Sequence, residues 1–326
     1  MKAEILKRLR ESEHYVSGQQ LCEEFEVSRT AVWKVIRQLQ DEGYEIEAIR
    51  NKGYRILAYP DVLNREAVQS LLKTDWAGRN LVYLSTTDST NTQAKKLGDQ
   101  GAGHGTLVLA QEQTGGKGRR GRSWASSSDE NIYMTILLRP DIAPVKAPML
   151  TLVMAHSAAR TIREQTGLKA QIKWPNDVIV GGKKVCGILT EMSAEIDYIN
   201  HVVIGIGINT NMKVIPEELR EKATSLRLEQ GGEIRRADLT AAIVERFESD
   251  YALFMETQDL SGLREQYMRL LANRGKEVRI HEVGEEYCGV ALGINERGEL
   301  LIEKEDGTVT EIFAGEVSVR GIYGYV

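Results

Sequence analysis

Cysteine is scarce in this chain of 326 residues, and the three that are present lie far apart. Cys22, Cys186 and Cys288 form none of the short pairings that metal sites and redox dithiols use. We therefore expect all three to be reduced packing residues, and we expect no structural zinc. The five histidines are scattered and make no readable Ser-His-Asp or Cys-His arrangement, so nothing points to a covalent enzyme intermediate.

Long apolar runs and an excess of positive charge are also lacking. No segment reaches the roughly 18 apolar residues of a membrane helix, and residues 1–13 are charged and amphipathic, unlike a signal peptide. We expect a cytoplasmic protein with no membrane partner. The net charge of -5 excludes a generally basic nucleic-acid binder, so any DNA affinity requires a local patch. With 42% hydrophobic residues, the chain has room for two or three domains.

The first segment, residues 1–60, has the pattern of a winged helix-turn-helix. Ser17 and Ser28 are suited to cap the second and third of three helices, and the third ends at Gly43. Two strands follow over 44–49 and 53–57, joined by a turn that contains Asn51 and Gly53. Three helices and a hairpin are the parts of this fold.

Positive charge within this segment lies on the two elements that would contact DNA. Residues 1–57 hold ten basic and ten acidic residues, yet the third helix has no acid before Asp41, and the turn of the wing is basic. Recognition helices reach base edges while wing cations contact phosphates. A merely solvated helix face, or a protein-binding role for this domain, remains the alternative. The candidate DNA-binding residues are Arg29, Thr30, Trp33, Lys34, Arg37 and Lys52.

The rest of the chain divides into two further segments. Residues 64–273 mix helices with apolar strands at 107–110, 133–138, 178–180, 185–192 and 201–208, which predicts an α+β core. Two helices, over 236–255 and 260–272, close it. Residues 275–326 alternate short strands with turns at 283–284, 295–298 and 306–307, which predicts a small five-stranded barrel.

A basic, glycine-rich loop is the most informative stretch of the chain. Residues 115–122 contain four glycines and four cations, directly after the strand at 107–110. Glycines let backbone N–H groups approach an anion, and guanidinium groups grip carboxylate or phosphate oxygens. The spacing matches neither a Walker A loop nor a dinucleotide fingerprint. Taken alone, a flexible nucleic-acid-binding loop fits about as well.

Four further motifs lie before and after this loop in the sequence. Asp88-Ser-Thr-Asn offers hydroxyls and an amide for a neutral polar ring such as a ureido group, although a plain helix N-cap is the simpler interpretation. Lys173-Trp-Pro-Asn-Asp places a cation, an amide and a carboxylate around a turn, which suits phosphate, ribose or Mg²⁺. Lys184-Val-Cys-Gly-Ile-Leu puts a lysine at the mouth of a hairpin, and Gly205-Ile-Gly-Ile-Asn ends a buried strand with a polar residue.

Together with the terminal Gly315-Glu-Val-Ser-Val-Arg, these motifs occur in the order found in one protein family. The chain resembles the bifunctional biotin protein ligases that also repress the biotin operon. The resemblance covers essentially the whole chain. It implies a winged helix-turn-helix, a central mixed α/β catalytic domain and a C-terminal SH3-like β-barrel. It also implies ATP and Mg²⁺ as cofactors, and as partners a biotin carboxyl carrier protein domain and operator DNA.

The resemblance also assigns roles to particular residues. Catalysis is expected from Lys184, Arg119, Lys173 and Asp177. Biotin is expected to contact Ser89, Thr90, Asn91, Gln113, Lys117, Gly118, Arg119 and Lys184. The nucleotide is expected near Arg119, Arg122, Asn176 and Asn209, with Mg²⁺ held through the nucleotide at Asp177. Lys117 departs from the arginine of many members, and lysine cannot make a two-pronged contact.

The implied reaction has two steps. The biotin carboxylate attacks the α-phosphate of ATP to give biotinyl-5′-adenylate, and a carrier lysine then takes the biotin and releases AMP. We expect the loop at 115–128 to be mobile when empty and to fold over the adenylate. Its ordering would favour a homodimer, with the adenylate as corepressor and with the edge of the strand at 202–209 as one candidate contact.

Two other functions compete with this interpretation. A winged-helix repressor with a decayed enzyme core would bind a ligand without catalysis, but the retention of Lys173, Asp177 and Lys184 argues against decay. A lipoate or octanoate ligase would leave the basic loop and the N-terminal segment unexplained.

Overall fold

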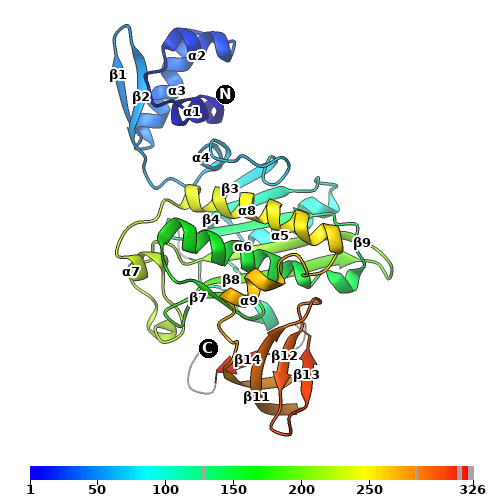
Figure 1. Cartoon of the computed structure of the whole chain (residues 1–326). Helices are drawn as coiled ribbons and strands as arrows, with labels where there is room; N and C mark the ends of the chain where they lie inside the picture. Colours follow the sequence, from blue (N-terminus) through cyan, green and yellow to red (C-terminus); the bar gives the residue numbers. More distant parts are fainter. Residues whose placement is uncertain (127–128, 283–284, 314–317, 322–326) are drawn as a thin grey trace.

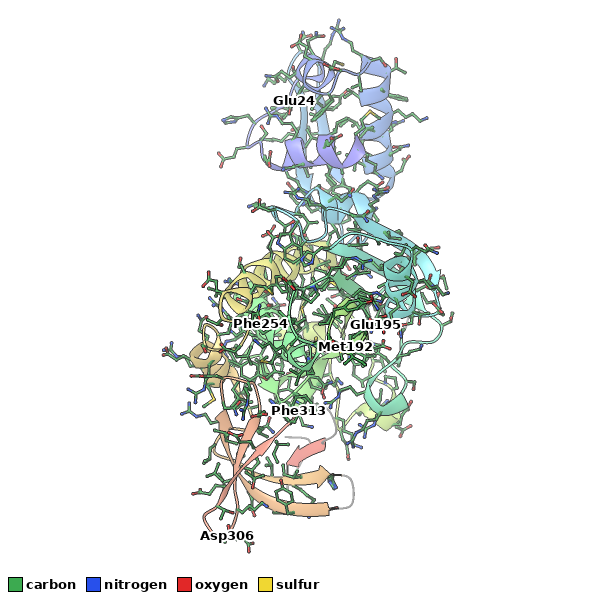
Figure 2. The ribbon with its side chains drawn as sticks, turned by 90° about the vertical axis from the view of Figure 1, so that its right-hand side faces the viewer. Glu24, Met192, Glu195, Phe254, Asp306 and Phe313 are labelled. Atoms are coloured by element: carbon green, nitrogen blue, oxygen red, sulfur yellow. The ribbon has the colours of Figure 1, made fainter. Side chains whose placement is uncertain are left out.

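A computed structural model describes residues 1–126, 129–282, 285–313 and 318–321. The chain folds into three regions that follow one another along a long axis, with the first 60 residues at one end and the C-terminal strands at the other (Figure 1). Figure 2 shows the same order from the side, with Glu24 in the first region, Phe254 in the central one and Asp306 in the last.

The N-terminal region is a winged helix-turn-helix, as predicted. Its elements are α1 (Lys2–Arg10), α2 (Gly18–Glu24), α3 (Arg29–Asp41), β1 (Glu45–Ile49) and β2 (Gly53–Ala58). The Ser17 hydroxyl accepts from the Gln20 N–H at 3.0 Å, and the Ser28 hydroxyl accepts from the Ala31 N–H at 3.2 Å. Both predicted caps are therefore present. A hydrophobic core of its own, built around Leu6, Leu21 and Val35, holds the helices together.

The central region contains a seven-stranded sheet. Its strands are β3 (Leu81–Thr87), β4 (Thr106–Gln113), β5 (Ile132–Leu138), β6 (Gln171–Lys173), β7 (Asp177–Val180), β8 (Lys183–Ala194) and β9 (Ile199–Ile208). They lie in the order β3-β4-β5-β9-β8-β7-β6, and every neighbouring pair is antiparallel except β3 and β4. The expectation that the strand at 202–209 offers an exposed edge is wrong, because β9 pairs with β5 on one side and β8 on the other.

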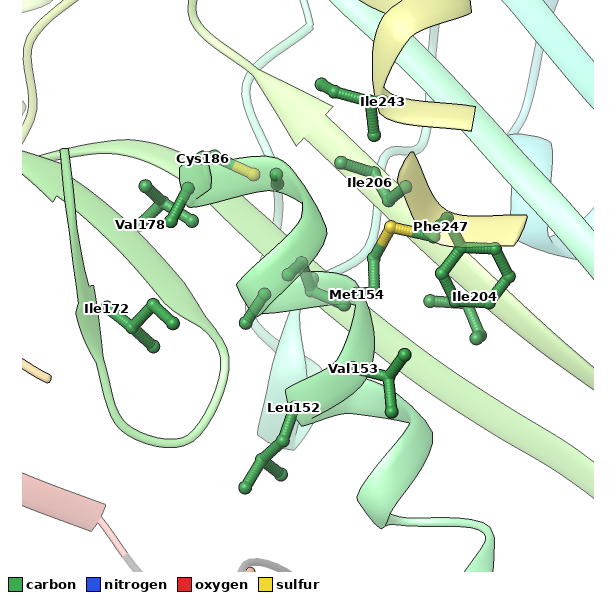
Figure 3. Packing of buried hydrophobic residues seen from close by; sticks show 14 of the residues in the cluster. Leu152, Val153, Met154, Ile172, Val178, Cys186, Ile204, Ile206, Ile243 and Phe247 are labelled. Carbon is green, nitrogen blue, oxygen red and sulfur yellow. The ribbon is translucent and has the colours of Figure 1, made fainter. Parts of the chain in front are cut away.

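One face of this sheet is covered by α6 (Met149–Thr166) and α8 (Arg236–Thr257). Figure 3 shows Ile204 and Ile206 of β9 packed with Met154 of α6 and Phe247 of α8. Since alternate residues of a strand face opposite sides, the residues between them face the other side of the sheet. There α5 (Thr90–Asp99) packs Ala94 against Val108, Leu137 and Val203, and it covers only part of that face.

The C-terminal region is a five-stranded antiparallel sheet, which matches the predicted number of strands. Its strands are β10 (Glu277–Glu282), β11 (Glu285–Ile294), β12 (Leu300–Glu303), β13 (Val309–Ile312) and β14 (Ser318–Gly321), in the order β13-β12-β11-β10-β14. The predicted turn at 283–284, and residues 315–317 of the terminal motif, lie outside the described residues.

Shorter helices connect these layers. They are α4 (Arg65–Gln69), α7 (Leu226–Gln230) and α9 (Arg264–Leu270). Across the part of the chain that the structure describes, no helix is long and apolar enough to cross a membrane.

Polar contacts join the three regions. Asp61, in the connection after β2, accepts a hydrogen bond from Arg236 Nε of α8 at 2.8 Å and one from Asn211 Nδ2 at 2.8 Å. At the other end of the central region, Trp174 Nε1 donates to the Gly298 carbonyl at 3.0 Å. The central region is thus anchored on both sides.

Candidate functional site

Glycines make the floor of a cavity on the face of the sheet that α5 leaves open. The register places Gly187 of β8 opposite Gly207 of β9, and Leu189 opposite Gly205. A Cβ atom at Gly205 would lie 2.0 Å from Asn91 Oδ1, and one at Gly207 would lie 2.6 Å from the Trp124 ring. Only glycine lets these side chains lie directly on the backbone.

The cavity above this floor opens to solvent. All eight residues that the resemblance assigned to biotin line it: Ser89, Thr90, Asn91, Gln113, Lys117, Gly118, Arg119 and Lys184. The other described residues of the lining are Trp124, Asn176, Gly187, Ile188, Leu189, Gly205, Ile206 and Gly207. Residues from five separate motifs of the sequence therefore meet in one place.

One end of the cavity is polar and neutral. The Thr90 backbone N–H and hydroxyl both donate to Gln113 Oε1, at 2.8 and 3.1 Å. The Thr135 hydroxyl lies 2.8 Å from Thr90 Oγ1 and 2.7 Å from Asn91 Oδ1. Ser89 is the N-cap residue of α5, yet its side chain makes no capping hydrogen bond. This end can recognise a neutral ring that carries both donors and acceptors.

The other end of the cavity carries charge. Arg119 Nη1 donates to Asn176 Oδ1 at 2.9 Å, and Lys184 Nζ lies 2.6 Å from Asp177 Oδ1. Lys184 also stands 5.0 Å from the centre of the Trp124 ring. Burial lowers the pKa of the Arg119 guanidinium, and the charge of Asp177 opposes part of that shift. Two cations can therefore meet an anion here.

The basic loop folds back on itself beside the cavity. Gly115 N–H donates to the Asp88 carbonyl at 2.8 Å, Gly118 N–H to Arg122 at 2.7 Å, and Trp124 N–H to Gly116 at 2.9 Å. Arg120 has a φ of 57°, in the left-handed region that turns use. These bonds place Trp124 over the glycine floor. Residues 127 and 128 of the loop lie outside the described residues.

Four of the residues expected near the nucleotide or in catalysis are not among the described residues that line the cavity: Arg122, Lys173, Asp177 and Asn209. Arg122 is exposed. Asn209 is buried and donates to the Thr224 carbonyl at 3.1 Å. Lys173 is buried and pairs across β6 and β7 with Asp177, which contacts Lys184, so it adjoins the charged end.

Sequence reasoning assigned no role to Trp124 or to the floor glycines, although both lie within the quoted motifs. The alternation Gly205-Ile-Gly-Ile was the available signal. In a strand it puts two glycines on one face and two isoleucines on the other.

No group of three or more His, Cys, Asp or Glu side chains suited to a metal is found within the described ranges. The Asp177 carboxylate stands beside the Asn176 amide, whose Nδ2 is 3.2 Å from Asp177 Oδ1. One carboxylate at a phosphate site is the donor set of a Mg²⁺ ion that arrives with a nucleotide.

The candidate DNA-binding residues lie together on one side of the N-terminal region. Arg29, Thr30, Trp33, Lys34 and Arg37 of α3 are all exposed, as is Lys52 in the turn of the wing. Arg29 and Lys52 line a groove between α3 and the hairpin. Arg37 stands 5.5 Å from the ring centre of Trp33, which is 55% exposed. This face is suited to an anionic polymer.

Comparisons with known proteins agree with this organisation. Residues 2–55 match a family model described as HTH domain, residues 83–209 match the Biotin/lipoate A/B protein ligase family, and residues 275–320 match the Biotin protein ligase C terminal domain. A solved structure of biotin protein ligase from Aquifex aeolicus in complex with biotin and ATP aligns with a TM-score of 0.66 and 31% identity. It covers 74% of this chain and 99% of that one. The fold is that of a biotin protein ligase joined to a helix-turn-helix domain.

Curated relatives share the whole arrangement. The Bifunctional ligase/repressor BirA of Bacillus subtilis is 39% identical over 307 residues, which is 94% of each chain. The protein of the same name from Escherichia coli is 30% identical and covers 93% of this chain, with 92% of its own length matched. The chain belongs to the family of bifunctional biotin protein ligases and repressors.

Proposed function

We propose that the chain joins biotin to a lysine of a biotin carboxyl carrier protein domain with ATP, and represses biotin genes when it carries biotinyl-5′-adenylate. The observation that carries this proposal is the cavity itself. Its neutral polar end suits a ureido ring, and its charged end suits a carboxylate and a phosphate. Family membership supports the same assignment.

In the first step, two anions must meet at the charged end. The biotin carboxylate attacks the α-phosphate of ATP, which forms a C–O–P anhydride and releases pyrophosphate. Arg119 and Lys184 lower the repulsion between the anions and stabilise the charge that develops on the α-phosphoryl oxygens. Asn176 holds the Arg119 guanidinium in place, and Lys173 lies beside Asp177 to attract phosphate.

Asp177 is the residue that would hold Mg²⁺ through the nucleotide. When bound, the ion would offset charge on the leaving pyrophosphate. Asp177 also fixes Lys184, because the carboxylate and the ammonium are 2.6 Å apart. The same carboxylate therefore prepares the cation that the first step requires.

In the second step, a lysine amine of the acceptor attacks the activated acyl carbon and expels AMP. The anhydride is open to hydrolysis unless water is kept away. Trp124 is placed to do this, because its ring lies on the floor glycines and its backbone N–H is held by the Gly116 carbonyl. We infer that the loop opens to admit substrates and closes over the adenylate.

For repression, the exposed cations of α3 and the wing would contact operator DNA, with Arg29, Thr30 and Lys34 nearest the base edges. A homodimer would place two such helices on a two-fold operator, and loop closure around the adenylate would favour it. The proposed use of ATP and DNA supports a cytoplasmic location.

Labelled biotin, lipoate and octanoate, each with MgATP and a carrier domain, test the enzymatic assignment directly. We expect label on the carrier lysine with biotin alone. Transfer of lipoate or octanoate with equal efficiency, or no transfer of biotin, would refute the assignment.

A further inference from the structure

Glu191, which is not among the residues that line the cavity, holds the amide group of Asn91, which does line it. Asn91 Nδ2 donates to Glu191 Oε2 at 2.8 Å and to the Leu189 carbonyl at 3.1 Å. The opposite oxygen of Glu191 lies 2.6 Å from Lys95 Nζ. Both N–H groups of the Asn91 amide are therefore used, and the side chain is only 3% exposed.

These contacts fix which way the Asn91 amide points. If the amide were reversed, its oxygen would face a carbonyl and a carboxylate, and three acceptors would repel one another. The Thr135 hydroxyl lies 2.7 Å from Asn91 Oδ1 on the other side and can donate a hydrogen bond to this oxygen. The oxygen thus lies on the cavity floor at Gly205, where an added Cβ would be 2.0 Å away.

The Glu191 carboxylate stays ionised in this setting. Burial alone would raise the pKa of Glu191, but hydrogen bonds from Lys95 and Asn91 and the charges of Lys95 and Lys117 bring it below its ordinary value. An ionised carboxylate accepts only, so it cannot hold the Asn91 amide in the opposite orientation.

We propose that Glu191 is a positioning residue that determines specificity: through Asn91 it presents a carbonyl oxygen to the ligand and so selects a ring with an N–H donor. An amide oxygen accepts two hydrogen bonds, and Thr135 supplies at most one of them. A ureido N–H can supply the other. A dithiolane ring, which has no donor, would leave this buried acceptor without a new partner. The inference rests on the proposed function, since it concerns how the same cavity reads biotin.

The test compares Glu191→Ala and Glu191→Gln with Glu195→Gln, the matched control. Glu195 is exposed on the loop that joins β8 and β9 (Figure 2). Calorimetric titration with biotin in the absence of ATP should show about tenfold weaker binding for Glu191→Ala, which corresponds to loss of one well-placed hydrogen bond. Glu191→Gln keeps an acceptor and should lose less. In steady-state assays the KM for biotin should rise, while kcat and the KM for ATP stay unchanged.

A biotin analogue in which one ureido N–H is replaced by oxygen separates positioning from simple packing. Two such analogues exist, one for each ureido N–H. For one of them, the replacement should weaken binding about tenfold in the unmodified protein and much less in Glu191→Ala, because the Asn91 oxygen is no longer held in place in that variant. Glu191→Gln provides the same comparison if the alanine variant fails to fold.

Three results would overturn the proposal. Biotin could bind Glu191→Ala and Glu191→Gln as tightly as the unmodified protein. For both analogues, the loss of affinity relative to biotin could be the same in the variants as in the unmodified protein. A fall in kcat and a rise in both KM values, with a lower melting temperature, would show a structural role instead. Failure of the unmodified protein to bind biotin would refute the proposed function itself, which is a separate result.

Discussion

Lys184 is held between a carboxylate and an aromatic ring at the charged end of the cavity. Its ammonium lies 2.6 Å from Asp177 and 5.0 Å from the centre of the Trp124 ring. Both contacts hold the side chain in one place. A cation fixed before the substrates arrive stabilises a developing phosphoryl charge without reorganisation.

Lys184→Ala should lower the rate of adenylate formation by about 100-fold, the scale of losing one preorganised electrostatic contact. Biotin-dependent exchange of pyrophosphate into ATP measures this step without the acceptor. The fold should persist, because Lys184 is only half-buried at the start of β8.

Lys183→Ala is the matched control, since this neighbouring lysine is not among the described residues that line the cavity. It should keep the normal exchange rate. A Lys184→Ala variant that forms adenylate as fast as the parent would exclude the catalytic role.

At the scale of elements, the two faces of β8 and β9 carry different kinds of residue. Their isoleucines face α6 and α8, while Gly187, Gly205 and Gly207 make a flat floor for Trp124 and Asn91. The strand pattern therefore builds the core and the cavity at once. A methyl group added to a floor glycine would disturb the cavity without removing any contact from the hydrophobic core.

Gly207→Ala should speed the escape of biotinyl-adenylate, because the new methyl would lie 2.6 Å from the Trp124 ring and force the loop away. Stopped-flow release of the adenylate measures the effect, and we expect at least a tenfold faster rate. Gly103→Ala is the control, because an added Cβ there meets nothing within 4 Å. Unchanged release from Gly207→Ala would mean that Trp124 does not close the site.

Elements with a clear local signal were predicted well, and those set by distant contacts were not. Capping serines and alternating strands are local, so the winged region and the strands β4, β5, β7, β8 and β9 could be located. The place of β9 in the sheet could not, because strand order depends on pairing between segments far apart. For the same reason the floor glycines gained a meaning only when the register placed Gly187 opposite Gly207.

The whole molecule joins a DNA-binding region with its own core to the ligase region through a connection that is anchored at Asp61. Asp61 binds Arg236 at the start of α8 and Asn211 just after β9, and both partners are buried. The core around Leu6, Leu21 and Val35 is a separate cluster from that of the central sheet. Each region therefore has the packing to fold by itself.

Removal of residues 1–60 should abolish operator binding and leave a folded ligase with reduced activity. The deletion removes the exposed cations of α3 and the wing, but it keeps Asp61 and its contacts. Gel-shift assays and biotin transfer to the carrier domain measure the two functions on one preparation. A truncated chain that is insoluble or unfolded would show that the central region depends on the first.

The contribution of the Asp61 anchor to ligase activity can be tested separately in the full chain. Asp61→Asn in the full chain weakens the anchor through Arg236 while leaving the DNA-binding surface intact. Because the deletion keeps Asp61, a fall in ligase activity in Asp61→Asn would show that the anchor supports the catalytic region independently of the N-terminal region.

Arg119 is the residue through which we expect ligand binding and repression to be coupled. It belongs to the basic loop and lines the cavity. Its guanidinium donates a hydrogen bond of 2.9 Å to Asn176, which lies in the turn between β6 and β7. A charge-assisted contact from this group to the carboxylate or phosphate of the adenylate is worth about 2 to 3 kcal/mol, or roughly 30- to 150-fold in affinity. If the closed loop favours the dimer, binding of the adenylate and formation of the dimer strengthen each other by linkage, so a loss of adenylate affinity also weakens the dimer.

Arg119→Ala should therefore retain the adenylate less well and need more biotin, with ATP present, both to dimerise and to occupy its operator. Arg120→Asn is the control, because it removes a neighbouring charge while asparagine tolerates the φ of 57° at this position. Sedimentation and operator binding, each titrated with biotin, give the two midpoints. Should Arg119 only contact solvent or the acidic surface of an acceptor, transfer to the carrier would fall while both midpoints stayed where they were. An unchanged midpoint for dimerisation would end the coupling hypothesis and leave the ligase assignment intact, since the cavity and its other contacts do not depend on it.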